Sequence, residues 1–230
     1  MFKETLLLTI AVLGGTGKEG KGLAYRWAKA GYRVLIGSRS SEKAVTAASA
    51  IMELLEGSSS VVGTTNQEAA EQANIVVLTV PYSAHRATLE SVKDALPGKL
   101  LVDVAVPLVP PRLSKVQMPP AGSAAQEAKE IVGDDVEVAA AFQNVSHEHL
   151  LDEEEIECDV LVTGTSQKAR ADVLKLVEAA GLTGWDAGPL ENSVVLEGLA
   201  SVLININRLY GSKHAGIKIT GVPKPSTESA

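Results

Sequence analysis

The stretch TIAVLGGTGKEG at residues 9–20 decides the fold class of this chain. Its first five residues are apolar or β-branched, which predicts a strand covered on both faces. Gly15, Gly17 and Gly20 then form a G-x-G-x-x-G pattern, and residues 18–30 read as a helix that closes at Gly31. The pattern alone is weak evidence. Between a buried strand and a helix, however, it is typical of a dinucleotide-binding βαβ unit.

Strand-like and helix-like segments alternate along the rest of the chain. Strands are expected over residues 5–13, 32–36, 61–62, 75–80, 100–106, 136–142 and 160–163. Helices are expected over residues 18–30, 42–56, 67–72, 83–96, 123–132, 167–180 and 193–210, with Ser41 as the cap of the second. This order predicts an α/β fold, a Rossmann doubly wound parallel sheet with a small C-terminal α/β domain.

Composition bounds the function. The chain has 230 residues, of which 45% are hydrophobic and 3% aromatic, and a net charge of −7. A negative net charge with few aromatic side chains argues against nucleic-acid binding, which needs a positive field and stacking platforms. The single cysteine, Cys158, excludes an internal disulfide and favours a reducing cytoplasm. No stretch approaches the ~20 apolar residues of a membrane span.

The glycines of the motif have separate expected roles. Gly15 permits the tight turn, Gly17 lets the backbone approach a pyrophosphate, and Gly20 lets the helix pack closely against the strand. The pyrophosphate would lie on the free N–H groups of the helix N-terminus. The alternative interpretation is a glycine-rich turn without a ligand.

The end of the second strand indicates which dinucleotide is bound. NAD-selective sites usually carry a carboxylate there, whereas this chain reads Gly37-Ser38-Arg39-Ser40. A carboxylate would repel a 2′-phosphate, but Ser38 and the planar guanidinium of Arg39 can bind it, with Lys43 one helical turn further on. The sequence therefore favours NADP(H). The alternative is that Arg39 is a solvated surface residue.

At this point the sequence resembles a known family. The segments that carry the resemblance are VLGGTGKEGKGLA, VLIGSRSSEKA, LTVPYSAH and the C-terminal AGIKITG. They resemble the NADPH-dependent reductases of coenzyme F420, a 5-deazaflavin. The resemblance extends over nearly the whole chain, and the bacterial members are closest. The resemblance implies hydride transfer between NADP(H) and F420. It also implies a set of cofactor-binding positions in the phosphate loop, the 2′-phosphate pocket, the end of a central strand and the C-terminal turn near the nicotinamide. These are Gly15, Thr16, Gly17, Lys18, Glu19, Gly20, Ser38, Arg39, Lys43, Val80, Pro81, Ala215 and Gly216.

The chain is accordingly interpreted as a cytoplasmic oxidoreductase that acts on small-molecule co-substrates. Residues 1–137 would form the NADP-binding Rossmann domain, 138–222 a smaller domain that completes the cleft, and 223–230 a flexible tail. The deazaflavin is expected between the two domains, near Val80-Pro81, residues 107–110, residues 143–147 and Ala215-Gly216. No catalytic residue is named, because the cofactors carry the hydride chemistry themselves. The alternatives are a reductase of another flavin or small substrate, and a non-catalytic NADP(H)-binding sensor.

Three further features have plainer interpretations. His147-Glu148-His149 lacks the additional ligands of a metal site, so no metal is expected. Asp152-Glu153-Glu154-Glu155 reads as a solvated loop, and Cys158 as a small core residue. The apolar stripe of the last helix is interpreted as a buried or homodimer-forming face. Its members are Val194, Val195, Leu199, Val202, Leu203, Ile206 and Leu209.

Overall fold

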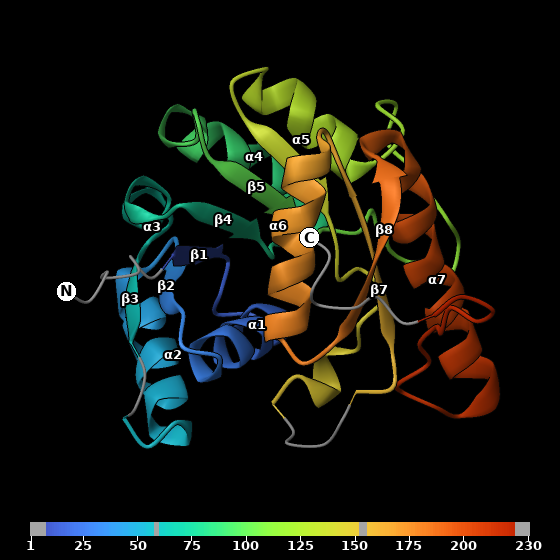
Figure 1. Ribbon diagram of the computed structural model, residues 1–230, viewed down its shortest axis with the longest axis horizontal. Coiled ribbons are helices and arrows are strands. Elements are labelled where there is room, and N and C mark those ends of the chain that lie inside the picture. The colour runs from blue at the N-terminus through green and yellow to red at the C-terminus, as the bar shows by residue number, and fades with distance from the viewer. Residues whose placement is uncertain (1–7, 58–59, 152–155, 224–230) are drawn as a thin grey trace.

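An eight-stranded sheet runs through the computed structural model, which describes residues 8–57, 60–151 and 156–223 (Figure 1). The strands are β1 (Thr9–Leu13), β2 (Arg33–Ser38), β3 (Val61–Thr65), β4 (Ile75–Leu78), β5 (Leu100–Asp103), β6 (Glu137–Ala140), β7 (Asp159–Gly164) and β8 (Thr183–Pro189). Their order in the sheet is β3-β2-β1-β4-β5-β6-β7-β8. All neighbours are parallel except β6 and β7, which are antiparallel. The predicted Rossmann sheet is confirmed.

Seven α-helices of the described chain surround this sheet. They are α1 (Lys18–Lys29), α2 (Ser41–Leu54), α3 (Asn66–Gln72), α4 (Tyr82–Val92), α5 (Ala124–Val132), α6 (Gln167–Ala179) and α7 (Ser193–Tyr210), with short 3-10 turns η1 (Lys93–Ala95), η2 (His147–His149) and η3 (Leu190–Asn192). The core has two layers. One face of the sheet packs on α1, α2 and α6, and the other on α3, α4 and α5. Helices on both faces explain why the central strands are apolar throughout.

The strand order changes direction at β1 and β4, which are neighbours in the sheet. After β1, β2 and β3 are added on one side, and β4, β5 and β6 on the other. The carboxyl ends of β1 and β4 therefore diverge into opposite connections and leave a crevice between them. Open α/β sheets bind their ligands at such a point.

Most expected helices and strands match observed ones to within a few residues. Two details were wrong. Ser40, rather than Ser41, caps α2, because its hydroxyl accepts from Lys43 N–H. In addition, β8 was not predicted at all. Residues 5–7 of the expected first strand, residues 152–155 of the acidic loop and residues 224–230 of the expected tail lie outside the described residues.

The C-terminal segments continue the sheet. The expected domain boundary at residue 137 coincides with the first residue of β6, and β7 and β8 extend the same sheet beyond it. Arg26 on α1 donates to the carbonyls of Leu150, at 2.8 Å, and His149, at 3.0 Å, which ties η2 to the first helix. A Cβ on Gly22 would lie 2.3 Å from Leu150 Cβ, so only glycine allows this approach. The division into two domains stays a prediction.

The last helix, α7, has two apolar faces. Leu196, Ala200 and Leu203 point inward and are buried, whereas Val195, Val202 and Leu209 are exposed. The predicted single stripe therefore mixed residues of both faces. No helix within the described residues is both long and apolar enough to cross a membrane.

Candidate functional site

The glycine-rich loop joins β1 to α1 at the crevice. Gly14 has a φ of 71°, in the left-handed region that favours glycine. A Cβ on Gly20 would lie 2.6 Å from Thr79 Oγ1, so a glycine is required for the helix to pack there. Gly17 differs, because within the part of the chain that the structure describes a Cβ there would meet only the Gly14 carbonyl oxygen, at 3.5 Å. Gly17 therefore borders open space, as a residue that faces a ligand should.

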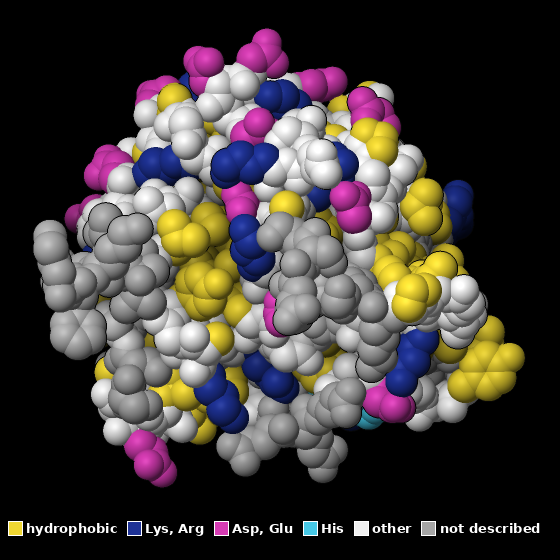
Figure 2. Space-filling view, in the orientation of Figure 1, with side chains coloured by type: hydrophobic (Ala, Val, Ile, Leu, Met, Phe, Trp, Pro, Cys, Tyr) yellow, Lys and Arg dark blue, Asp and Glu magenta, His cyan; other side chains and the backbone are white. Residues whose placement is uncertain are grey.

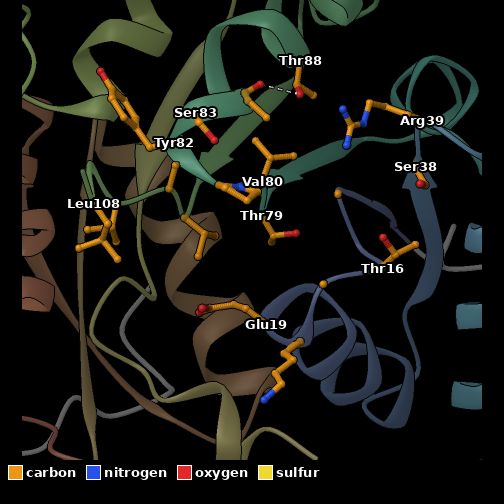
Figure 3. Close-up of a pocket in the computed structure, with 18 of the residues that line it drawn as sticks. Thr16, Glu19, Ser38, Arg39, Thr79, Val80, Tyr82, Ser83, Thr88 and Leu108 are labelled. Carbon is orange, nitrogen blue, oxygen red and sulfur yellow. Dashed lines mark hydrogen bonds between the residues drawn. The ribbon is translucent and has the colours of Figure 1, made fainter. Parts of the chain in front are cut away.

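A cavity of about 650 Å³ opens beside this loop, at the carboxyl ends of the strands (Figure 3). Eight of the predicted site residues lie in its wall: Thr16, Gly17, Lys18, Glu19, Ser38, Arg39, Val80 and Pro81. Gly15 and Gly20 do not line it, since they shape the turn beneath it. The positive end of α1 faces the cavity, and its N-cap, Gly17, carries no side chain. Such a helix terminus suits a phosphate group.

The far end of the cavity carries the groups expected to select the dinucleotide. Ser38 is buried at the end of β2, and its hydroxyl accepts from Ser40 N–H at 3.2 Å. Arg39 is exposed and has no hydrogen-bond or ion-pair partner within the described residues. In Figure 3 its side chain reaches over the cavity from the strand end, beside Ser38 and Thr16. Lys43 lies outside the cavity wall. A free guanidinium at this place is suited to a phosphate.

The sequence analysis missed several groups of the wall. Asn66, at the start of α3, accepts a hydrogen bond from Gly14 N–H at 3.3 Å and so supports the turn. The hydroxyl of Thr79 donates to the Leu13 carbonyl at 3.0 Å, which joins the ends of β1 and β4. Tyr82, Ser83 and Thr88 complete this side. No sequence pattern identifies these positions, because they become neighbours only through the strand order.

A second cavity, of about 480 Å³, shares Glu19, Val106 and Leu108 with the first. Its other wall residues come from the β6–η2 connection and from α7 and the turn after it, and include Gln143, His147, Asn207 and Ala215. Gly216 lines neither cavity. A Cβ there would lie 2.8 Å from Cys158 Sγ, in a third hollow. The expected nicotinamide contacts of Ala215 and Gly216 stay predictions.

Two oxygens at the second cavity lack hydrogen bonds. Glu19 Oε1 and Gln143 Oε1 are both buried and unpartnered within the described residues. Gln143 Nε2 donates to the Asp103 carbonyl at 2.8 Å, so the amide oxygen must face the other way. Burial raises the pKa of Glu19 to about 8, because desolvation penalises the charged form. Buried polar atoms without partners are uncommon and require an explanation.

A buried polar cluster supports the cavity wall from behind. His85 Nε2 on α4 and Asp103 Oδ2 on β5 are 2.6 Å apart and fully buried. Asp103 Oδ1 also accepts from Ala105 N–H at 2.9 Å, which orders the connection that supplies Val104, Ala105 and Val106 to the wall. Burial lowers the pKa of His85, but the hydrogen bond and charge of Asp103 outweigh it, so the pKa lies above its ordinary value.

Two glutamates complete the cluster. Glu197 on α7 accepts from the backbone N–H groups of Ala124, at 2.7 Å, and Ala125, at 3.1 Å, at the N-terminus of α5. Its burial nevertheless raises its pKa to about 8. Glu127 accepts from the Tyr82 hydroxyl at 2.7 Å and from Arg86 at 2.6 Å. Burial raises the pKa of Glu127, but these two partners lower it further, and the net shift is downward.

The remaining candidates occupy ordinary environments. His147 and Glu148 belong to η2, and Glu148 pairs with Lys18 at 3.6 Å. Within the described residues no group of three or more His, Cys, Asp and Glu side chains is placed to hold a metal ion. Cys158 is buried, as expected, beside the Asn144 amide at 3.1 Å, and burial raises the pKa of its thiol.

Comparison with known proteins identifies close relatives. Residues 9–107 match the family model described as "NADP oxidoreductase coenzyme F420-dependent". The F420-dependent NADP reductase of Methanothermobacter marburgensis is 43% identical over 225 residues, which cover 94% of this chain and all of the relative. That of Methanocaldococcus jannaschii is 36% identical and covers 94% of this chain and 99% of its own. A crystal structure from Arthrobacter sp. FB24, assigned as an F420-dependent NADP reductase, superposes with a TM-score of 0.77 at 26% identity, covering 93% of this chain and all of that one.

Proposed function

The chain belongs to the family of coenzyme F420-dependent NADP oxidoreductases, and from that premise we propose the role of its two cavities. The enzyme transfers a hydride between NADP(H) and F420, which its curated relatives are named for. In our proposal the dinucleotide occupies the 650 Å³ cavity and the deazaflavin ring the adjoining 480 Å³ cavity. The observation that carries this assignment is the wall that the two cavities share.

The residues present fit these two ligands. Gly17 leaves open space at the positive end of α1, where a pyrophosphate would accept hydrogen bonds from backbone N–H groups. Arg39 has no partner among the described residues and would bind the 2′-phosphate. The apolar side chains of Val106 and Leu108 line both cavities and would keep water from the place where the two rings meet.

Hydride chemistry is supplied by the bound cofactors, of which the reduced nicotinamide donates and the oxidised deazaflavin accepts. The contribution of the chain is geometry. Holding two rings in contact converts a bimolecular reaction into an effectively unimolecular one, which can lower the barrier by up to roughly 7–11 kcal/mol in favourable cases. In this proposal the ordered connection after β5, fixed by Asp103, positions the wall against which the rings lie.

Turnover separates this function from its rivals. Mixing the protein with NADPH and F420 should bleach the absorbance of the deazaflavin, and replacing F420 with a riboflavin-type flavin should give far slower oxidation of NADPH. Fast reduction of the other flavin alone would favour a different reductase. Tight NADPH binding without turnover of either would favour a non-catalytic sensor.

Removal of the Arg39 guanidinium should reduce the preference for NADPH. We expect Arg39→Ala to weaken NADPH binding by roughly 10- to 100-fold, the value of one or two hydrogen bonds to a charged group, and to leave NADH binding unchanged. Titration calorimetry with both cofactors measures this. Lys93→Ala is the control, since Lys93 is an exposed cation that lines neither of the two cavities. Equal losses for NADPH and NADH would place Arg39 outside the 2′-phosphate site.

The outer face of α7 supports a homodimer as the working form. Val195, Val202 and Leu209 follow one another at seven-residue spacing and are 62%, 46% and 64% exposed. Figure 2 shows hydrophobic side chains along the side of the molecule where α7 lies. An apolar helix face of this length is self-complementary, because two copies related by a two-fold axis would cover each other's stripe.

A charge on this stripe should dissociate the dimer. Val202→Glu would bury a carboxylate in an apolar interface, so this variant should be a monomer in sedimentation velocity experiments where the wild type is a dimer. Val45→Glu is the control, because Val45 is a comparably exposed valine, at 51%, on α2. A wild-type chain that sediments as a monomer at all concentrations would rule out the dimer. The single cysteine supports a cytoplasmic location for this enzyme of small-molecule co-substrates. The net charge of −7 and the 3% aromatic content argue against nucleic-acid binding.

A further inference from the structure

Glu19 occupies an unusual place for an acidic residue. It lies in the first turn of α1, and its side chain forms part of the wall of both cavities. In Figure 3 the carboxyl group extends away from Thr16, toward the side of the cavity where Leu108 lies. Oε1 is buried and receives no hydrogen bond from the described residues. A carboxylate in this position would face the negatively charged cofactors without a partner.

Charged and titratable groups around Glu19 do not compensate its charge. Lys18 is engaged by Glu148 at 3.6 Å, and His147 Nε2 lies 3.1 Å from the same carboxylate. The other such groups in the two walls are Arg39, Tyr82 and Lys213. The cause of the raised pKa of Glu19, about 8, is desolvation alone. At neutral pH the group therefore carries a proton, which makes it a hydrogen-bond donor as well as an acceptor.

Gln143 supplies the complementary group in the second cavity. Its amide nitrogen is committed to the Asp103 carbonyl, and its unpartnered oxygen is an acceptor. A protonated carboxyl and an amide oxygen together offer one donor and one acceptor. That pair matches an amide edge, which presents one C=O and one N–H group. Both the carboxamide of nicotinamide and the imide of a deazaflavin ring carry such an edge.

We propose that the Glu19 carboxyl donates a hydrogen bond to the carbonyl of this amide edge while the Gln143 oxygen accepts from its N–H group. Glu19 is then a specificity-determining residue for the ring bound where the cavities meet, and ligand binding is linked to its proton. The inference rests on the proposed function, since it requires that an amide-bearing cofactor ring occupies this place. An ionised Glu19 loses the donor and repels the phosphates, so affinity falls as the pH rises through its pKa.

Titration calorimetry between pH 7 and pH 9.5 tests the linkage. For the cofactor that carries the edge, the affinity of the wild type should fall by up to about tenfold per pH unit above pH 8. Glu19→Gln keeps a donor of the same shape but cannot ionise, so its affinity should stay constant to within about twofold over the same range. Glu53→Gln, on the exposed surface of α2, is the control and should follow the wild type.

Three probes distinguish the source of the edge. NADP⁺ carries the nicotinamide, ADP-ribose 2′-phosphate lacks it, and F420 carries the imide. If the pH profile of the affinity for NADP⁺ differs between wild type and Glu19→Gln, and that for ADP-ribose 2′-phosphate does not, the edge belongs to nicotinamide. If the profile for F420 differs between the two proteins, the edge belongs to the deazaflavin. Comparison of wild type and Glu19→Gln at each pH cancels the titration of the ligand itself.

The infrared spectrum gives a readout that needs neither ligand nor turnover. The wild-type spectrum minus the Glu19→Gln spectrum at pH 7 should show a protonated carboxyl band that disappears from this difference above pH 8. Glu197, whose pKa burial also raises to about 8, contributes to both proteins and cancels in the difference. Cofactor binding with identical pH profiles in both proteins would overturn this inference and leave the proposed function standing. Failure of NADP⁺ and F420 to bind at any pH would overturn the proposed function, and this inference with it.

Discussion

Gly17→Val should abolish dinucleotide binding without unfolding the protein. A side chain at this position projects into the cavity, since among the described residues a Cβ would have only the Gly14 carbonyl within 4 Å, at 3.5 Å. The backbone of Gly17 has φ −72° and ψ 166°, an extended conformation that valine adopts readily. The substitution therefore introduces no strain in the free protein. It instead fills the space where a pyrophosphate must approach the backbone, so we expect the affinity for NADPH to fall by roughly 100-fold or more.

A second glycine of the same motif provides a matched contrast. Gly20→Val would bring its Cβ to 2.6 Å from Thr79 Oγ1 and 2.7 Å from Gly15 Cα, so the cost is paid in folding. Calorimetry with NADPH and thermal unfolding should separate the two variants. Gly17→Val should unfold within a few degrees of the wild type, and Gly20→Val well below it. Tight NADPH binding by Gly17→Val would remove the dinucleotide from this loop.

The sequence could predict this loop because its physics is local. A strand, a tight turn and the start of a helix follow one another within residues 9–20. The atoms that limit the space at each glycine lie close in the chain or at the end of an adjacent strand. The position of Ser38 and Arg39 beside this loop could also be predicted, because a parallel sheet brings the ends of adjacent strands to the same edge. Both residues line the 650 Å³ cavity.

β8 could not be predicted, because its strand structure depends on tertiary contacts rather than on its own sequence. Its sequence, TGWDAGP, contains two glycines, an aspartate and a proline, none of which favours a strand. The segment is a strand because β7 supplies a partner and because Gly184 allows the close approach of Leu174 and Val177 on α6. These are tertiary effects, and local propensity does not contain them.

The buried polar cluster was beyond the reach of sequence reasoning. His85, Asp103 and Glu197 come from three elements and are separated by up to 112 positions, the distance in sequence between His85 and Glu197. In the sequence each reads as an ordinary surface residue of a helix or a strand end. Only the strand order and the packing of α4, α5 and α7 bury them together, and their pKa shifts follow from that burial.

Separating the His85–Asp103 pair should cause the largest loss of stability among the changes considered. His85→Leu leaves the Asp103 carboxylate fully buried, with the Ala105 N–H group as its one remaining hydrogen-bond partner among the described residues. Removing one member of a buried ion pair typically costs about 3–5 kcal/mol in the free energy of unfolding. Adding Asp103→Asn should recover most of this loss, because asparagine keeps an oxygen for Ala105 N–H and carries no charge. Urea unfolding of the wild type, the single and the double variant measures both effects.

The contribution of His85 to the free energy of unfolding should depend on pH in a defined direction. The pKa of His85 lies above its ordinary value in the folded protein, so between the unfolded and folded pKa the native state binds more protons than the unfolded state. The stability that His85 contributes is therefore complete below about pH 6.5, its unfolded pKa, and is lost as the pH rises through the folded pKa. Glu19 titrates in both proteins and cancels, so the difference between wild type and His85→Leu reports the histidine together with its charge interaction with Glu197. We expect that difference to be largest at pH 6 and to shrink toward pH 9. A difference that grows with pH would mean that His85 is neutral in the folded protein and that Asp103 is held by other groups.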